Sequence, residues 1–163
     1  MLEITGFYTF RFVEEVFINA PASAGFAFFE NMQDNYVLWH PDHIDFEWRK
    51  GCGLEVGNVF WFKEKIADKT MTKTTRITEV IPDRYFAFEM TNPLFRFFLP
   101  KLSFEFAPKD AGFVFRAELC LKGIGPLGRH LNKSEFDAVD IHMVEEGKNL
   151  KAILEHDTKI ISS

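Results

Sequence analysis

The chain has 163 residues and a formal net charge of −5 at neutral pH. Its lysines and arginines are scattered, without a basic stripe of interleaved aromatic residues, which argues against nucleic acid as a partner. No apolar run approaches the roughly 20 residues of a membrane span, and the N-terminus lacks the basic-then-apolar order of a signal peptide. The two cysteines, Cys52 and Cys120, lie far apart and are typical of reduced thiols, so we expect a cytoplasmic protein.

Phenylalanine is unusually abundant, with 20 copies in the chain. So many rings are hard to pack into one solid core, and flat rings suit the walls of a hollow that accepts an apolar ligand. No linker, repeat or low-complexity tract divides the chain, and its length suits one domain. We therefore expect a single domain over residues 1–163 that binds a hydrophobic or aromatic small molecule. The oligomeric state is left open.

The predicted elements follow from the alternation of apolar residues and from turn residues. Residues 8–18 alternate well enough for a strand, which Asn19-Ala20-Pro21 ends. Residues 22–39 predict two short helices that are broken near Asn31, and Pro41 ends the second one. Six further strands are predicted, at 44–50, 59–66, 70–80, 84–90, 102–107 and 112–122.

The remaining segments are connectors and one long helix. Residues 91–100 lie near two prolines and are expected to form an apolar loop or short turn. The last two strands are expected to turn at Pro108-Lys109-Asp110. Residues 123–130 form a connector rich in Gly and Pro, and a final helix is expected from about 133 to 157, with Asn132 or Ser134 as its cap.

This order of one strand, two helices, six strands and one helix predicts an α+β protein. Six successive strands imply an antiparallel meander that must curl to shield its apolar face, and the C-terminal helix then packs in the open side as in a helix-grip fold. The order resembles the START-related superfamily of hydrophobic-ligand-binding proteins, which birch pollen allergens and polyketide cyclases typify. The segment FINAPASAGFAFF, residues 17–29, carries the resemblance, because in that superfamily a first strand ends in Ala-Pro before two short helices.

Several polar residues are expected on the inner side of this fold. His142 and Glu146 lie four residues apart on the final helix, so they share a face that packs on the sheet. In strand 59–66, Lys63 and Lys65 mark the wet face, and Glu64 therefore points inward among aromatic residues. A buried carboxylate without a cation or hydrogen bonds is costly, and a metal ion or a hydrogen-bonded, protonated acid would each resolve that cost.

The segment WHPDHIDFEW, residues 39–48, adds two histidines near a rim of the sheet. Each of them alone is commonly a surface residue of a polar loop. Together the candidate set is His43, or alternatively His40, with Glu64, His142 and Glu146. Imidazoles combined with carboxylates suit Zn²⁺, and Fe²⁺ or Mn²⁺ are not excluded by ligand type.

This set resembles the diacetylphloroglucinol and phloretin hydrolases, a metal-dependent branch of the same superfamily. The resemblance implies zinc ligands from a His-rich segment after the short helices, from a following strand, and from a His-x-x-x-Glu pair on the last helix. His43, Glu64, His142 and Glu146 match those positions in that order. The known enzymes are considerably longer, so the resemblance carries over the metal and not the substrate.

The leading hypothesis is a metal-dependent hydrolase that cleaves a carbon–carbon bond between an acyl group and a phenolic, phloroglucinol-like ring. The metal would act as Lewis acid, and His40 or Tyr36 would act as general acid or base. The aromatic cavity would hold the ring, with Phe60, Phe62 and Met143 at its border.

Two alternatives remain open. The chain could be a non-catalytic carrier or sensor of a hydrophobic small molecule, since this fold does not determine function. It could also be a metal-free cyclase or dehydratase of polyketide-like substrates, with Glu64 and His142 as acid and base. Metal content separates the first hypothesis from these two.

Overall fold

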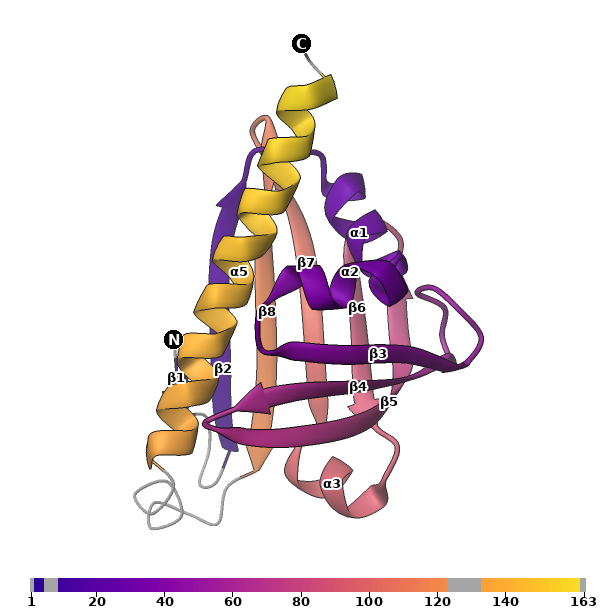
Figure 1. Ribbon diagram of the computed structural model, residues 1–163, viewed down its shortest axis with the longest axis vertical. Coiled ribbons are helices and arrows are strands. Elements are labelled where there is room, and N and C mark those ends of the chain that lie inside the picture. The colour runs from indigo at the N-terminus through magenta and orange to yellow at the C-terminus, as the bar shows by residue number, and fades with distance from the viewer. Residues whose placement is uncertain (1, 5–8, 123–132, 162–163) are drawn as a thin grey trace.

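The computed structural model describes residues 2–4, 9–122 and 133–161 (Figure 1). Its strands form an antiparallel sheet of eight, in the spatial order β1-β2-β8-β7-β6-β5-β4-β3. The strands are β1 Leu2–Ile4, β2 Thr9–Ile18, β3 His43–Lys50, β4 Val59–Ile66, β5 Lys69–Ile81, β6 Tyr85–Met90, β7 Lys101–Lys109 and β8 Gly112–Lys122. The helices are α1 Ala22–Glu30, α2 Met32–Trp39, α3 Pro93–Phe98 and α5 Lys133–Ile161.

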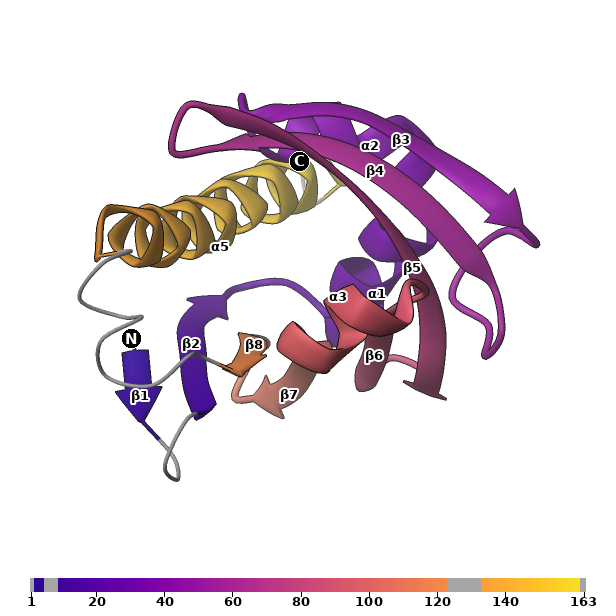
Figure 2. The ribbon, with the colours of Figure 1, turned by 90° about the horizontal axis from the view of Figure 1, so that it is seen from below.

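The sheet is a curved meander that returns to its first long strand. β3 to β8 pair with successive neighbours, and β8 then pairs with β2, where Val13 lies opposite Glu118. Figure 2 shows the strands curling from β2 round to β3, with α5 lying inside the curve. The predicted helix-grip architecture is therefore confirmed. No helix in the described ranges is long and apolar enough to cross a membrane.

Tight turns hold neighbouring strands in register. Asp68, Asp83 and Asp110 lie in hairpin turns with positive φ angles of 62°, 58° and 51°. Aspartate tolerates this left-handed region better than most side chains do. The β4–β5 turn keeps Phe62 opposite Lys73, which decides what the inner face of these two strands presents.

A packed aromatic cluster lies where α1 packs on β7 and β8. Phe29 stacks on Phe104 and Phe115, with ring centroids 5.0 and 5.7 Å apart. Gly25 permits this close approach of α1, since a Cβ there would lie 2.6 Å from the ring of Phe113. The aromatic residues therefore serve a packed core as well as the cavity described below.

Helix α3 stands where a loop or short turn was expected. Pro93 occupies its first turn, where no amide hydrogen bond is lost. The side chain of Asn92 accepts hydrogen bonds from the amides of Leu94 and Phe95 at 2.9 and 3.4 Å, which caps the helix. Asn92-Pro93 is thus a helix start that could have been recognised in the sequence. The prolines and the apolar residues of 91–100 suggested a loop instead.

The strands also differ from the predictions at two places. β1 was not predicted, because three residues are too few to show an alternation, and it pairs with β2. β7 continues through Pro108 to Lys109 instead of turning there. A proline is tolerated at this position because β6 pairs with β7 only as far as Glu105, so the missing amide faces no partner strand.

The start of the last helix is only partly described. The predicted connector 123–130 and the predicted cap Asn132 lie outside the described residues. Ser134 lies inside α5, and its hydroxyl donates to the carboxylate of Glu135 at 2.9 Å.

Candidate functional site

A cavity of about 520 Å³ lies between the inner face of the sheet and α5. Among the described residues, eight phenylalanines line it and eleven do not, although their abundance suggested a lining role. Phe60, Phe62 and Met143 border the cavity, and whether they bind a ligand stays a prediction. The polar side chains in its wall are Tyr36, Glu64, Thr72, Lys73, Glu118, His142 and Glu146.

Most of these polar groups gather where α2, β4, β5 and α5 meet, and His43 of β3 lies against them, with its Nε2 3.0 Å from Oε1 of Glu146. We call this region the polar end of the cavity and define it by Tyr36, His43, Glu64, Lys73, His142 and Glu146.

Helix α5 brings two members of the polar end to the cavity wall. The four-residue spacing of His142 and Glu146 places both on the face that continues into the core at Leu150 and Leu154. The indole N–H of Trp39 donates to the backbone carbonyl of Glu146 at 2.9 Å and ties α5 to the end of α2.

Glu64 points inward from β4, as its alternation with Lys63 and Lys65 predicted. It is 5% exposed, and an ion pair with Lys73 of β5 neutralises one carboxylate oxygen, Oε1. Burial raises the pKa of Glu64, but the Lys73 ammonium outweighs burial and holds that pKa below its usual value. Glu64 is therefore an ionised carboxylate. Lys73 supplies the positive charge that the sequence led us to expect from a metal ion.

Hydrogen bonds orient the ring of His43. Its Nδ1 lies 2.9 Å from the backbone carbonyl of Tyr36, which can only accept, so Nδ1 carries a proton. Its Nε2 lies 3.0 Å from Oε1 of Glu146. In a neutral ring Nε2 holds a lone pair, so this contact is attractive only with a proton or a metal ion between the two atoms. The Tyr36 ring stacks parallel to the imidazole at 4.1 Å and holds its plane.

His40 is buried behind the polar end and does not line the cavity. It is 2% exposed, and its Nδ1 accepts a hydrogen bond from the amide of Asp42 at 3.0 Å. Nε2 therefore carries the proton of a neutral ring and donates to Oε2 of Glu145 at 3.1 Å. Both nitrogens thus have partners of the right polarity, and its ring packs 4.2 Å from that of His142.

His142 has a polar atom that no described residue satisfies. Its Nε2 lies 3.6 Å from Oε1 of Glu146 and 3.9 Å from Oε2 of Glu64, and it has no hydrogen-bond partner among the described residues. Burial lowers the pKa of His142 in spite of these two carboxylates, so the ring is neutral near pH 7. A buried nitrogen without a partner marks a place for a ligand, a water or an ion.

The four predicted metal ligands converge. The atom pairs His43 Nε2–Glu146 Oε1, Glu146 Oε1–His142 Nε2 and His142 Nε2–Glu64 Oε2 are 3.0, 3.6 and 3.9 Å apart. In a tetrahedral site with bonds of about 2.1 Å, neighbouring ligand atoms lie about 3.4 Å apart, so the donor types and these three of the six separations are compatible with a zinc-sized ion. Their role as ligands stays a prediction.

Distance alone groups the histidines differently. His40, His43 and His142 each place a ring nitrogen within 4.8 Å of the other two, and this cluster could hold a metal ion. The hydrogen bonds favour His43 over His40, because only His43 has a lone pair on Nε2 that faces the site. A backbone carbonyl on Nδ1 is also the usual partner that orients a metal-binding histidine.

Tyr36 is the polar-end group that keeps its proton. Burial raises the pKa of its phenol, and the negative charges of Glu64 and Glu146 raise it further. The hydroxyl therefore acts as a donor and points at Oε2 of Glu64 at 3.4 Å.

Sequence reasoning missed Lys73. Its strand reads TMTKTT, polar on both faces, so alternation does not tell which face is inner. The available signal was the register: a short turn after Ile66 places Lys73 opposite Phe62, on the face that carries Glu64.

No protein-family model and no curated protein matches the chain. Solved structures match it over nearly its full length. The KanY protein gives a TM-score of 0.72 at 18% identity, covering 93% of this chain and 99% of that one. Major latex-like protein 151 from Panax ginseng also gives 0.72, at 11% identity, with 90% and 98% covered. The di-domain ARO/CYC StfQ from the steffimycin biosynthetic pathway gives 0.71 at 12% identity, with 93% and 52% covered.

The chain has the helix-grip fold of these proteins. The predicted resemblance to allergen-like and cyclase-like proteins is thereby confirmed at the level of the fold. Identities below 20% show a shared architecture and leave the activity open. The finer resemblance to the zinc-dependent hydrolases stays a prediction.

Proposed function

We propose that the chain binds an aromatic small molecule that carries a hydroxyl group, with the ring among the cavity phenylalanines and the hydroxyl at the polar end. This proposal rests on one observation: the cavity of about 520 Å³ is mostly apolar, and its wall is polar in one place. That volume lies within the range of small-molecule sites, about 300–1,000 Å³. The fold of StfQ, which its name places in a biosynthetic pathway, agrees with such a role.

The polar end favours a hydroxyl because it contains both hydrogen-bond donors and hydrogen-bond acceptors. Glu64 and Glu146 accept hydrogen bonds, whereas Lys73, Tyr36 and His142 can donate them. A hydroxyl both donates and accepts, an ether only accepts, and a carboxylate would add a third negative charge beside two others. A ligand without the hydroxyl would leave buried polar groups unpaired, which costs about 1–3 kcal/mol per group.

The test compares 2-naphthol with 2-methoxynaphthalene, which share the ring system and differ at the oxygen. Chelator-treated protein should bind 2-naphthol at least about tenfold more tightly, as measured by calorimetry. In His142→Leu that ratio should fall toward one. Glu118→Gln is the matched control, because Glu118 lines the cavity but bonds to Arg11 at 2.7 Å, and it should keep the ratio. Equal affinities in the wild type would contradict the proposal.

A second candidate function is metal-dependent hydrolysis of an acylated phenol. The observation in its favour is a set of atoms that a metal ion would satisfy. They are Nε2 of His43, which faces Glu146, and Nε2 of His142, which has no hydrogen-bond partner among the described residues. With Glu64, these residues would hold Zn²⁺, or Fe²⁺ or Mn²⁺. A bound ion would polarise the acyl carbonyl as a Lewis acid.

The residues of the chain would do the remaining work of that reaction. Water adds to the acyl carbon, the bond from that carbon to the ring carbon breaks, and the ring carbon takes up a proton. Tyr36 borders the cavity with a protonated hydroxyl and is suited to deliver that proton. His40, whose nitrogens are both engaged outside the cavity, is suited to position the neighbouring His142 ring.

The third candidate, a metal-free cyclase or dehydratase, would use Glu64 and His142 as acid and base. The likeness in fold to the ARO/CYC protein favours it over hydrolysis. Elemental analysis of protein purified without an affinity metal, and again after dialysis against zinc, separates the two. One equivalent of metal is expected for the hydrolase, and no retained metal would end that candidate.

A further inference from the structure

Lys73 is the only lysine or arginine among the described residues that line the cavity. Its side chain is 18% exposed, and its ammonium lies 5.4 Å from the centre of the Phe62 ring. The ammonium forms its ion pair with Oε1 of Glu64. A largely buried charge of this kind is held in one place by its partner and by the ring.

The other metal-ligand candidates form no ion pair with a lysine or arginine of the described residues. Nε2 of His43, Nε2 of His142 and Oε1 of Glu146 are linked by separations of 3.0 and 3.6 Å. Glu64 lies further off, with Oε2 3.9 Å from Nε2 of His142. Lys73 balances the charge of Glu64, whereas the group formed by His43, His142 and Glu146 needs a proton or a metal ion.

We propose that Lys73 and a divalent metal ion compete for Glu64, so that the wild-type chain holds the ion through His43, His142 and Glu146 alone. The inference rests on the metal-dependent candidate above and narrows its ligand set from four residues to three. Two histidines and one carboxylate form a complete protein ligand set when a further position is left to water or a ligand. In this site that position belongs to the hydroxyl oxygen of the cavity ligand.

The direction of the effect follows from charge. The Lys73 ammonium repels a divalent cation and withdraws Glu64 from it, so both effects weaken metal binding. Removing Lys73 leaves Glu64 with an unbalanced charge that a metal ion can satisfy. Removing both residues restores the original net charge and leaves the three-residue ligand set intact.

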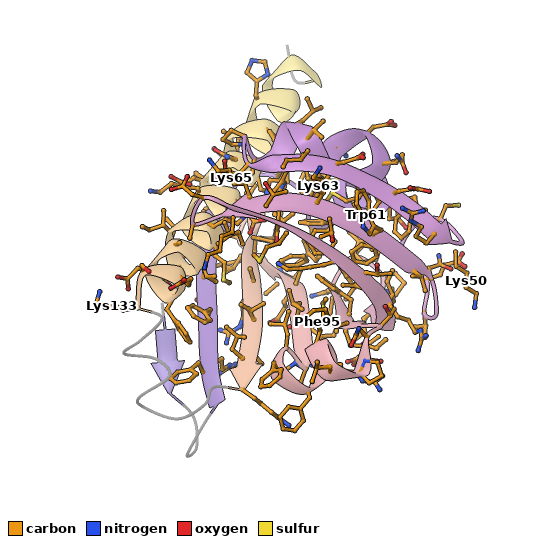
Figure 3. All side chains as sticks on the ribbon, turned by 60° about the horizontal axis from the view of Figure 1, so that its bottom comes forward. Lys50, Trp61, Lys63, Lys65, Phe95 and Lys133 are labelled. Atoms are coloured by element: carbon orange, nitrogen blue, oxygen red, sulfur yellow. The ribbon has the colours of Figure 1, made fainter. Side chains whose placement is uncertain are left out.

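The experiment titrates chelator-treated protein with Co²⁺ and follows visible absorption and heat. Lys73→Met should bind Co²⁺ at least about tenfold more tightly than the wild type, with a changed absorption spectrum as Glu64 joins the ion. The double variant Lys73→Met/Glu64→Gln should stay within about threefold of the wild type. Lys63→Met is the charge-matched control, because Lys63 lies on the outer face of β4, and it should not change affinity (Figure 3).

The outcomes separate this inference from the proposals it builds on. If the double variant binds Co²⁺ at least about tenfold more weakly than the wild type, Glu64 is a ligand and the inference is wrong. An unchanged or weakened affinity in folded Lys73→Met also overturns it. If Lys73→Met does not fold, as near-ultraviolet circular dichroism would reveal, the double variant alone decides. No Co²⁺ binding by any variant ends the metal-dependent candidate as well, while the naphthol comparison still tests aromatic binding independently.

Discussion

The two ends of the cavity are built in opposite ways. At the polar end, side chains from α2, β3, β4, β5 and α5 are buried or mostly buried and hold one another through hydrogen bonds and an ion pair. At the other end, α3 has no buried residue, and Leu94, Phe95 and Phe97 are 64%, 55% and 60% exposed. Phe95, a residue of α3, also borders the cavity (Figure 3).

From this difference we expect a fixed recognition site at the polar end and an entrance that opens beside α3. Groups that are buried and bonded keep their geometry, which is what selective hydrogen bonding to a ligand requires. A helix with few buried apolar contacts can shift at low cost. We therefore expect ligand selectivity to reside at the polar end and ligand exchange to occur beside α3.

The largest expected effect contrasts the packed core with the entrance. Phe115 is 1% exposed and Phe97 is 60% exposed. Phe115→Ala should lower the free energy of unfolding by about 4 kcal/mol, because it leaves a cavity in the core. Phe97→Ala should lower it by less than about 0.5 kcal/mol. Urea denaturation measures both, and similar losses would mean that α3 is packed as firmly as the core.

The next effect tests the metal-dependent candidate and separates metal binding from ring binding. His142→Ala should weaken Zn²⁺ binding at least about 100-fold, since a group that supports a ligand already contributes about 10–100-fold. Phe62→Ala should change Zn²⁺ affinity by far less than His142→Ala does, weaken 2-naphthol binding and cost about 3 kcal/mol of stability. Calorimetry with each probe measures the two affinities. A metal loss in Phe62→Ala equal to that in His142→Ala would show that the two functions are not separable.

A smaller effect concerns acid stability. The pKa of Glu64 is lowered by Lys73 in the folded chain from a usual value of 4.5. Its contribution to stability is therefore complete above that value and is lost as the pH falls through the lower, folded-state pKa. The melting temperature of the wild type should fall more steeply below about pH 4.5 than that of Lys73→Met/Glu64→Gln, which lacks this group. Parallel curves would mean that the buried pair contributes nothing to the pH dependence.

Local patterns in the sequence predicted the fold and the orientation of several polar-end side chains. Alternation in 59–66 placed Glu64 inward, and the four-residue spacing of His142 and Glu146 placed them on one helix face. Each of these inferences needs only the geometry of one element. The order of the elements then predicted the helix-grip fold.

The remaining features depend on contacts between distant segments. Lys73 belongs to a strand whose two faces are both polar, so only pairing with β4 places it beside Glu64. The choice of His43 over His40 depends on which backbone groups meet each ring, namely the carbonyl of Tyr36 and the amide of Asp42. Such hydrogen bonds depend on the path of the chain around Pro41, and the spacing of residues in the sequence does not predict them.

The most direct test of the central claim uses the methionine methyl groups as reporters. Four of the five methionines line the cavity: Met32, Met71, Met90 and Met143. In ¹³C-methyl-methionine protein, 2-naphthol should shift all four methyl signals. Met143, which follows His142, should show nuclear Overhauser effects to the ring protons beside the hydroxyl. Methyl signals that do not move, or a hydroxyl side of the ring that contacts Met90 instead of Met143, would contradict the account.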